Sequence, residues 1–113
     1  MILIDFQLNQ FVNVRPDHIL PGVVFPLRNC EDRALDWVIV RENSESEYAG
    51  QGGISHGHTP NATATEVAIF DHVGIERTMR FAFETAGSRR RKQVTLVTKS
   101  NVQRHGMVLW DYF

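Results

Sequence analysis

The chain has 113 residues, of which 42% are hydrophobic and 22% charged, a composition typical of a folded domain or of part of one. Its formal net charge of -1 excludes the broad basic surface that binding to a nucleic-acid phosphate backbone requires. The single cysteine, Cys30, excludes a disulfide framework or a thiolate metal site within one chain. Because the first residues form neither a secretory signal nor a membrane span, we expect a cytoplasmic protein with no membrane partner.

The first third of the chain predicts one strand and a proline-rich connection. Residues 1–14 are an apolar, partly alternating lead-in that ends at Arg15-Pro16, and proline disfavours helix for the residue before it, so Arg15 is expected on a turn or strand end. Residues 16–26 hold three of the four prolines and predict an extended or irregular connection. The continuous apolar run at 36–40 predicts a strand buried on both faces, as in a parallel sheet.

The middle of the chain predicts a long functional segment followed by a helix. Residues 44–65 are polar and rich in glycine, which favours either a functional loop or an arm that packs on another subunit, with a short strand at 66–70. From Gly74 the spacing becomes helical and Gly87 is a plausible stop. Glu76 and Arg80 form an i,i+4 pair on a second face. One face collects the apolar side chains: Ile75, Met79, Ala82, Phe83 and Ala86.

The last third predicts a second strand. Residues 93–98 follow a basic turn at 88–92 and lead into Lys99. Strand, helix and strand in this order predict a parallel βαβ unit with a right-handed crossover. Residues 102–113 resemble a helix that has only begun, and because both ends of the chain are apolar we expect a fragment of a larger domain.

Three cations occupy positions that favour an anion site. Arg41 follows one predicted strand, Lys99 follows the other, and ligands of open α/β sheets bind beyond the carboxyl ends of strands. With Arg15 they would hold a small polycarboxylate or phosphate; alternatively, each arginine pairs with a nearby acidic side chain. Tyr48 is protonated at neutral pH and could act as a general acid beside these cations, or it could simply pack at a loop edge.

Two further patterns each have a simple structural interpretation. His56 and His58 could bind a metal ion, but the polar loop offers no third ligand at a suitable spacing, so solvated side chains are the simpler reading. The basic turn at 88–92 could contact phosphate, but it also suits the C-terminal end of a helix dipole. No nucleotide-binding glycine fingerprint of the GxGxxG or GxxxxGK[ST] type occurs in the chain.

Four stretches, in this order and at these separations, closely resemble one enzyme family: VNVRP (12–16), LPG (20–22), VIVRENSESEYAGQGG (38–53) and VTKSN (97–101). They resemble the NAD-dependent β-decarboxylating dehydrogenases, and within that family the tartrate and D-malate dehydrogenase branch, close to 3-isopropylmalate dehydrogenase. The resemblance implies oxidation of a 2-hydroxy dicarboxylic acid (tartrate, D-malate or 3-isopropylmalate) by NAD and loss of carbon dioxide, with Mg²⁺ or Mn²⁺ held by the substrate.

The resemblance also implies roles for individual residues. Arg15 and Arg41 would each hold a substrate carboxylate, and Tyr48 would help to protonate the enolate carbon after decarboxylation. Lys99 would take part in removing the hydroxyl proton, reaching the active site of the other subunit of a homodimer. Asn101 would lie near the nicotinamide and the substrate.

The chain departs from the family pattern at several points. The family has glycine where this chain has Ser46, which predicts strain in the loop that directs Tyr48. A further substrate arginine of the isopropylmalate branch is absent between LPG and the next proline, so only Arg28 could substitute for it. The N-terminal strands of the family, its metal-binding aspartates and its adenosine-binding loop are also missing, so no metal ligand is assigned here.

We therefore expect residues 1–113 to be a single incomplete domain of the isopropylmalate/isocitrate dehydrogenase-like fold. This is an α/β fold with α/β/α layers and a mixed sheet, and its β arm at 54–70 mediates dimerisation. The functional expectation is a fragment of the oxidoreductase, inactive alone because positioning and metal activation must act together. The alternative is a non-catalytic module that pairs through its arm with a full-length relative or with itself.

Overall fold

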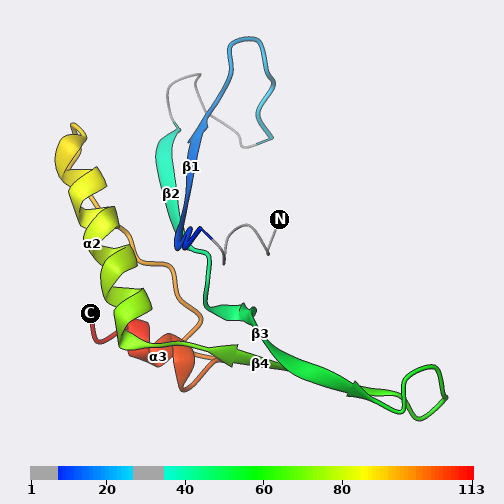
Figure 1. The fold of residues 1–113 in the computed structure, drawn as a ribbon. Helices are drawn as coiled ribbons and strands as arrows, with labels where there is room; N and C mark the ends of the chain where they lie inside the picture. The colour runs from blue at the N-terminus through cyan, green and yellow to red at the C-terminus, as the bar shows by residue number, and fades with distance from the viewer. Residues whose placement is uncertain (1–7, 27–34) are drawn as a thin grey trace.

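The computed structural model describes residues 8–26 and 35–113, which form two antiparallel strand pairs and two helices (Figure 1). Elements keep the labels of Figure 1. In chain order they are β1 (Val12–His18), β2 (Asp36–Glu42), β3 (Ser46–Ser55), β4 (Thr63–Ile69), α2 (His72–Ser88) and α3 (Gly106–Trp110). The predictions for 1–7, and that for Arg28, lie outside the described residues.

Strands β1 and β2 form an antiparallel ribbon in which Asn13 lies opposite Arg41 and Arg15 opposite Ile39. The expectation that Arg15 lies at a turn or strand end was wrong, because β1 continues to His18. Pro16 does not end the strand, since β1 is an edge strand, where a missing N–H is tolerated, and proline favours the extended conformation for the residue before it.

One face of this ribbon packs on α2, which runs antiparallel to β2 (Figure 1). Glu42 at the end of β2 pairs with Arg77 at 3.3 Å, and Asp36 at its start pairs with Arg89 at 2.6 Å. Residues 77 and 89 are about 18 Å apart along a helix axis, and residues 36 and 42 are about 20 Å apart along a strand. The two ion pairs therefore match in spacing and fix the helix along the strand.

The alternation along β2 shows that only this face is covered. Val38 and Val40 are half-buried on the α2 side, whereas Trp37 and Ile39 point to the other face and are 53% and 46% exposed. The prediction of a strand buried on both faces was wrong for this reason. A continuous apolar run does not distinguish a strand inside a sheet from one whose second face is open.

Helix α2 agrees closely with the helix predicted from Gly74 to Gly87. Its N-cap is Asp71, whose Oδ1 accepts the N–H of Gly74 at 2.8 Å, and it ends one residue after Gly87. The predicted Glu76–Arg80 pair is present at 2.7 Å. The buried face was predicted only in part.

The buried stripe of α2 comprises Ile75, which is fully buried, together with Ala86 and Thr78. Phe83, predicted to share this stripe, is 56% exposed. The reason is that the ribbon covers a narrow arc of the helix, so a face defined only by apolar residues is too wide.

Strands β3 and β4 form a hairpin that projects away from the helix (Figure 1). Of the two alternatives predicted for 44–65, a functional loop or an arm, the loop is corrected, because most of this stretch is strand. The strand predicted at 66–70 is largely confirmed by β4. Gly52 permits the pairing: a Cβ there would overlap the carbonyl oxygen of Thr65. Glycine thus marks close backbone approach here rather than a loop.

Residues 93–98 form no strand, so the parallel βαβ unit predicted from the sequence is not formed among the described residues. A strand needs a neighbour for its backbone hydrogen bonds, and none of the described strands runs beside this segment. Val97 is 87% exposed as a result. The short helix α3 begins later than the helix predicted from residue 102.

The described structure is open. Its radius of gyration is 18.1 Å, whereas a compact domain of this length has about 13 Å. The buried apolar side chains of the described residues form a small group: Ile19, Leu35, Ile75 and Ala86. None of the helices in the described ranges is long and apolar enough to cross a membrane.

Candidate functional site

The open face of the β1–β2 ribbon carries two of the predicted cations. Because side chains alternate along a strand and Asn13 lies opposite Arg41, Arg15 and Arg41 share one face as diagonal neighbours. Such diagonal pairs have Cα atoms about 7–8 Å apart, within reach of one small dianion for side chains of this length. The antiparallel pairing therefore brings the two arginines together, although the sequence predicted a different route.

Arg15 and Arg41 form no ion pair with a carboxylate of residues 8–26 and 35–113, where the arginines that do so are Arg77, Arg80 and Arg89. The charge of Arg41 nevertheless contributes to the lowered pKa of Glu47, mainly caused by its hydrogen bond from Ser46. The choice between an anion site and arginines that pair with acids therefore stays a prediction. Trp37 and Ile39 lie on the same face, so the two guanidinium groups border an exposed apolar surface.

Tyr48 lies directly against Arg41. The guanidinium carbon of Arg41 is 4.5 Å from the centre of the Tyr48 ring, a cation–π distance. Both residues are half-buried. A phenol and a guanidinium predicted from the sequence to serve the same ligand are therefore in contact, although seven residues and the end of a strand separate them.

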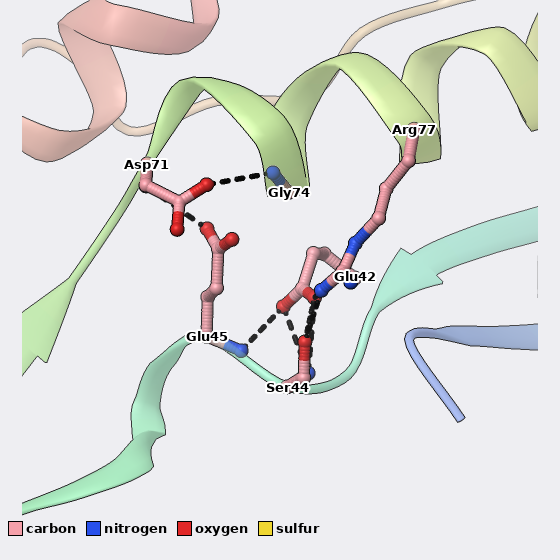
Figure 2. A network of polar contacts seen from close by, with 6 residues as sticks. All are labelled: Glu42, Ser44, Glu45, Asp71, Gly74 and Arg77. Carbon is pink, nitrogen blue, oxygen red and sulfur yellow. Dashed lines mark hydrogen bonds and ion pairs between the residues drawn. The ribbon is translucent and has the colours of Figure 1, made fainter. Parts of the chain in front are cut away.

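The segment between Arg41 and Tyr48 is held by a network of polar contacts (Figure 2). The carboxylate of Glu42 accepts the backbone N–H groups of Ser44 at 3.0 Å and of Glu45 at 2.7 Å. Arg77 donates from α2 to Ser44 Oγ at 2.5 Å and to Glu42 at 3.3 Å. The turn is thereby fixed to the first turns of the helix.

Glu45 is the buried acid of this network, with 8% of its surface exposed. Its Oε2 accepts the backbone N–H of Asp71 at 3.2 Å (Figure 2). Burial raises the pKa of the Glu45 carboxyl group, and the negative charges of Asp71 and Glu42 raise it further, against the hydrogen bond from Asp71. The N–H of Gly74 is the main cause of the lowered pKa of Asp71.

Ser46 begins β3 with φ of +64°, in the left-handed region that favours glycine. A register shift between Ser46 and Gln51 follows, so the strand is irregular where it carries Tyr48. The strain predicted for this position from the family's glycine is therefore present in the backbone.

Lys99 and Asn101 lie together at an exposed turn. The carbonyl of Lys99 accepts the N–H groups of Val102 at 2.9 Å and of Gln103 at 2.8 Å, which fixes the turn. Among the described residues, no hydrogen bond or ion pair joins either side chain to Arg15, Arg41 or Tyr48. The predicted convergence of Lys99 with Arg15 and Arg41, and a role for Lys99 in the other subunit, stay predictions.

The described residues do not fit a metal ion. No group of three or more histidine, cysteine, aspartate or glutamate side chains gathers within the two described ranges. His56 and His58 both have positive φ in the exposed turn of the β3–β4 hairpin. For NAD, the exposed amide of Asn101 is the predicted contact, and its fit stays a prediction.

Sequence reasoning did not identify Glu45, Asp71 or Arg77 as parts of the site. Asp71 has a detectable signal, because an aspartate directly before a helical pattern is a typical N-cap. Glu45 and Arg77 have none, since their contact depends on how α2 docks against the ribbon.

Solved structures and curated proteins resemble this chain over nearly its whole length. A crystal structure of isocitrate dehydrogenase from Methylococcus capsulatus matches with a TM-score of 0.78 and 33% identity, covering 94% of this chain and 30% of that one. A protein of Agrobacterium vitis named as a probable tartrate dehydrogenase/decarboxylase is 61% identical over 103 residues, which are 91% of this chain and 29% of the relative. A 3-isopropylmalate dehydrogenase of Clavibacter michiganensis subsp. michiganensis is 43% identical over 111 residues, 98% of this chain and 31% of the relative.

The shared fold places this chain in the isocitrate/isopropylmalate dehydrogenase fold class, which confirms the fold class predicted from the sequence. A family model described as isocitrate/isopropylmalate dehydrogenase matches residues 3–113. The chain belongs to this family. It spans about 30% of the length of the relatives that it matches.

Proposed function

We propose that this chain forms part of the substrate site of an NAD-dependent enzyme that oxidises and decarboxylates a 2-hydroxy dicarboxylic acid. Tartrate, D-malate and 3-isopropylmalate are the candidate substrates. The observation that carries the proposal is the placement of Arg15 and Arg41 on one open face with Tyr48 against Arg41. The names of the tartrate and 3-isopropylmalate relatives support the substrate class.

In this proposal the two arginines bind the two carboxylates of the substrate, since guanidinium groups hold carboxylates through paired hydrogen bonds. Loss of carbon dioxide from the oxidised substrate leaves an enolate, and Tyr48 donates a proton towards its carbon. Lys99 of a second copy takes part in removing the hydroxyl proton. Asn101 would lie beside the nicotinamide of bound NAD, which would supply the hydride acceptor for the oxidation.

The described residues supply no cluster for Mg²⁺ or Mn²⁺, so none of these roles is derived through the metal. The homodimer is a further part of the proposal. It has support in the β3–β4 hairpin, which projects from the rest of the described structure and includes the region 54–70 predicted to form the arm (Figure 1).

The test is to replace the matching segment of the Agrobacterium vitis relative with the 103 residues of this chain that align with it. NADH formation is then measured with D-malate, tartrate and 3-isopropylmalate in the presence of Mn²⁺, beside the 113-residue chain alone. We expect the grafted protein to turn over at least one of the three substrates. Turnover of none, in a folded graft, would contradict the proposal.

Variants in the active graft test the individual roles. Tyr48→Phe should lower kcat by about 10²–10⁴-fold with little change in KM, as loss of a proton donor does. Arg41→Lys should mainly raise KM, because it loses the bidentate fork but keeps the charge. Arg90→Lys in the exposed turn after α2 is the matched control and should leave both constants unchanged.

A second candidate function is a non-catalytic module that pairs through its arm with a full-length relative. The open shape of the described structure, with a radius of gyration of 18.1 Å, favours this function. Apolar side chains such as Ile54 are exposed in it and could be covered by a partner. Light scattering after size exclusion, with and without the Agrobacterium vitis relative, separates the two functions. A stable monomer that does not bind the relative would exclude pairing.

A further inference from the structure

We propose that Glu45 is a positioning residue for Tyr48, which it ties to the N-terminus of helix α2 through its buried carboxyl group. The inference rests on the proposed function, in which Tyr48 donates a proton to the substrate. Glu45 itself lies on the α2 side of the turn, so its effect passes through the backbone to Tyr48.

Three contacts connect Glu45 to the elements on either side of the site. Its side-chain Oε2 accepts the backbone N–H of Asp71, the N-cap of α2, at 3.2 Å. Its N–H donates to Glu42 Oε2 at 2.7 Å, next to Arg41. Its carbonyl accepts the N–H of Tyr48 at 3.2 Å. One residue thus joins the end of β2, the start of α2 and the backbone that aims the phenol.

The space for the Glu45 side chain is provided by Gly74. A Cβ at position 74 would overlap the Glu45 carboxyl group. The first turn of α2 therefore has no side chain at the position where the carboxyl group packs against it (Figure 2). Gly74 is itself buried and donates its N–H to Asp71. The close fit fixes the position of the carboxyl group, because any larger residue at 74 would displace it.

The raised pKa of Glu45 makes its contribution to folding depend on pH. The groups that face it are Asp71 and Glu42, with Arg77 joined to Glu42. Burial raises the pKa of Glu45 from its ordinary value of 4.5. The contribution of Glu45 to folding is therefore complete below about pH 4.5 and is lost as the pH rises through the higher folded-state pKa. The lowered pKa of Asp71 acts in the opposite direction, since its contribution is lost as the pH falls.

Tyr48 can be observed alone, because the chain has two tyrosines and Tyr112 is 80% exposed at the far end. The experiment labels the full chain, in a Tyr112→Phe background, with 3-fluorotyrosine and records one fluorine NMR resonance. An Arg41→Ala variant marks the resonance position of a Tyr48 ring that has lost its guanidinium neighbour.

We expect Glu45→Ala to move the Tyr48 resonance most of the way to the Arg41→Ala position. Glu45→Gln should leave it near the parent position, because the amide is neutral and can both accept from Asp71 and donate to it. The exposed Glu84→Ala is the control and should change nothing.

An unmoved resonance in a folded Glu45→Ala chain would overturn the inference. If Glu45→Ala does not fold, Gly74→Ala displaces the same carboxyl group, and an unmoved resonance in that variant would overturn the inference equally. In the active graft, Glu45→Ala should lower kcat by on the order of 100-fold with rescue by Gln. The resonance does not depend on turnover, so an inactive graft with an intact Tyr48 signal counts against the proposed function alone.

Discussion

At the scale of single residues, Ser46 is the point where this chain departs most clearly from the conformation its side chain prefers. Its φ of +64° costs roughly 1–2 kcal/mol for a residue with a Cβ. Replacement by glycine removes that cost but adds about 0.4–1 kcal/mol of unfolded-state entropy. Ser46→Gly should therefore raise the free energy of unfolding by about 0.5–1 kcal/mol, measured by urea denaturation of the full chain.

The matched control is Ser55→Gly at the other end of β3, where the backbone is not in the left-handed region. Glycine has no strain to relieve there, so the same substitution should destabilise by about 0.5–1 kcal/mol. If the free energy of unfolding rises for Ser46→Gly and falls for Ser55→Gly, backbone strain at Ser46 is the cause of the difference. A loss of stability at both positions would show that the Ser46 side chain, which hydrogen-bonds Glu47, matters more than its backbone.

Also at the residue scale, the sequence could predict which side chains are candidates but not which of them pair with acids. Arg41 and Arg77 are equivalent as residue types, yet Arg77 holds Glu42 and Arg41 stacks on Tyr48. The difference arises from the alternation of β2: Glu42 points to α2, and Arg41 points away. The alternation is visible in the sequence, but the side on which the helix docks is not. The sequence therefore leaves both the arginine cluster and the ion-pair alternative open.

At the scale of elements, the two ion pairs that fix α2 along β2 should differ in strength. The side chain of Glu42 is 8% exposed, whereas that of Asp36 is 74% exposed. Arg77→Met should lower the free energy of unfolding by about 1.5–3 kcal/mol, since it leaves a buried carboxylate without its cation. Arg89→Met should cost less than about 1 kcal/mol.

Urea denaturation of the two variants, each repeated at high salt, checks this difference. Salt should weaken the Arg89 pair and leave the Arg77 pair nearly unchanged, because screening acts on exposed charges. Equal losses would mean that both pairs are solvated and that the helix is held by apolar contacts alone.

Elements that are stabilised by residues within their own sequence were predictable, and elements that depend on a partner elsewhere in the chain were not. Helix α2 has its 3.6-residue period, its Asp71 cap and its Glu76–Arg80 pair within its own sequence. The strand predicted at 93–98 has suitable residues but no neighbouring strand among the described residues, so it did not form. Strand β3 lies in the stretch predicted as a functional loop or an arm, and it was not predicted as a strand because its glycines break the usual strand composition. One of these glycines, Gly52, instead allows β3 and β4 to approach.

At the scale of the whole molecule, the β3–β4 hairpin is the element least supported by the rest of the chain. Residues 50–69 are exposed throughout, and a two-stranded hairpin is marginally stable in water without a surface to cover it. The ribbon, by contrast, is covered on one face by α2. We propose that a second copy stabilises this arm, which is also the arrangement that the proposed role of Lys99 requires.

Ile54 tests this association, because it is 73% exposed on the hairpin. Burying an isoleucine against a second copy contributes about 1.5–3 kcal/mol, so Ile54→Lys should weaken association by at least about 10-fold. Light scattering after size exclusion should show the parent chain above its monomer mass of 12.9 kDa and the variant shifted towards it. Val24→Lys, at a position that is 93% exposed outside the hairpin, is the matched control and should associate like the parent. A parent chain that stays at the monomer mass at every accessible concentration would mean that the hairpin requires a different partner, and Lys99 would then have no second active site to enter.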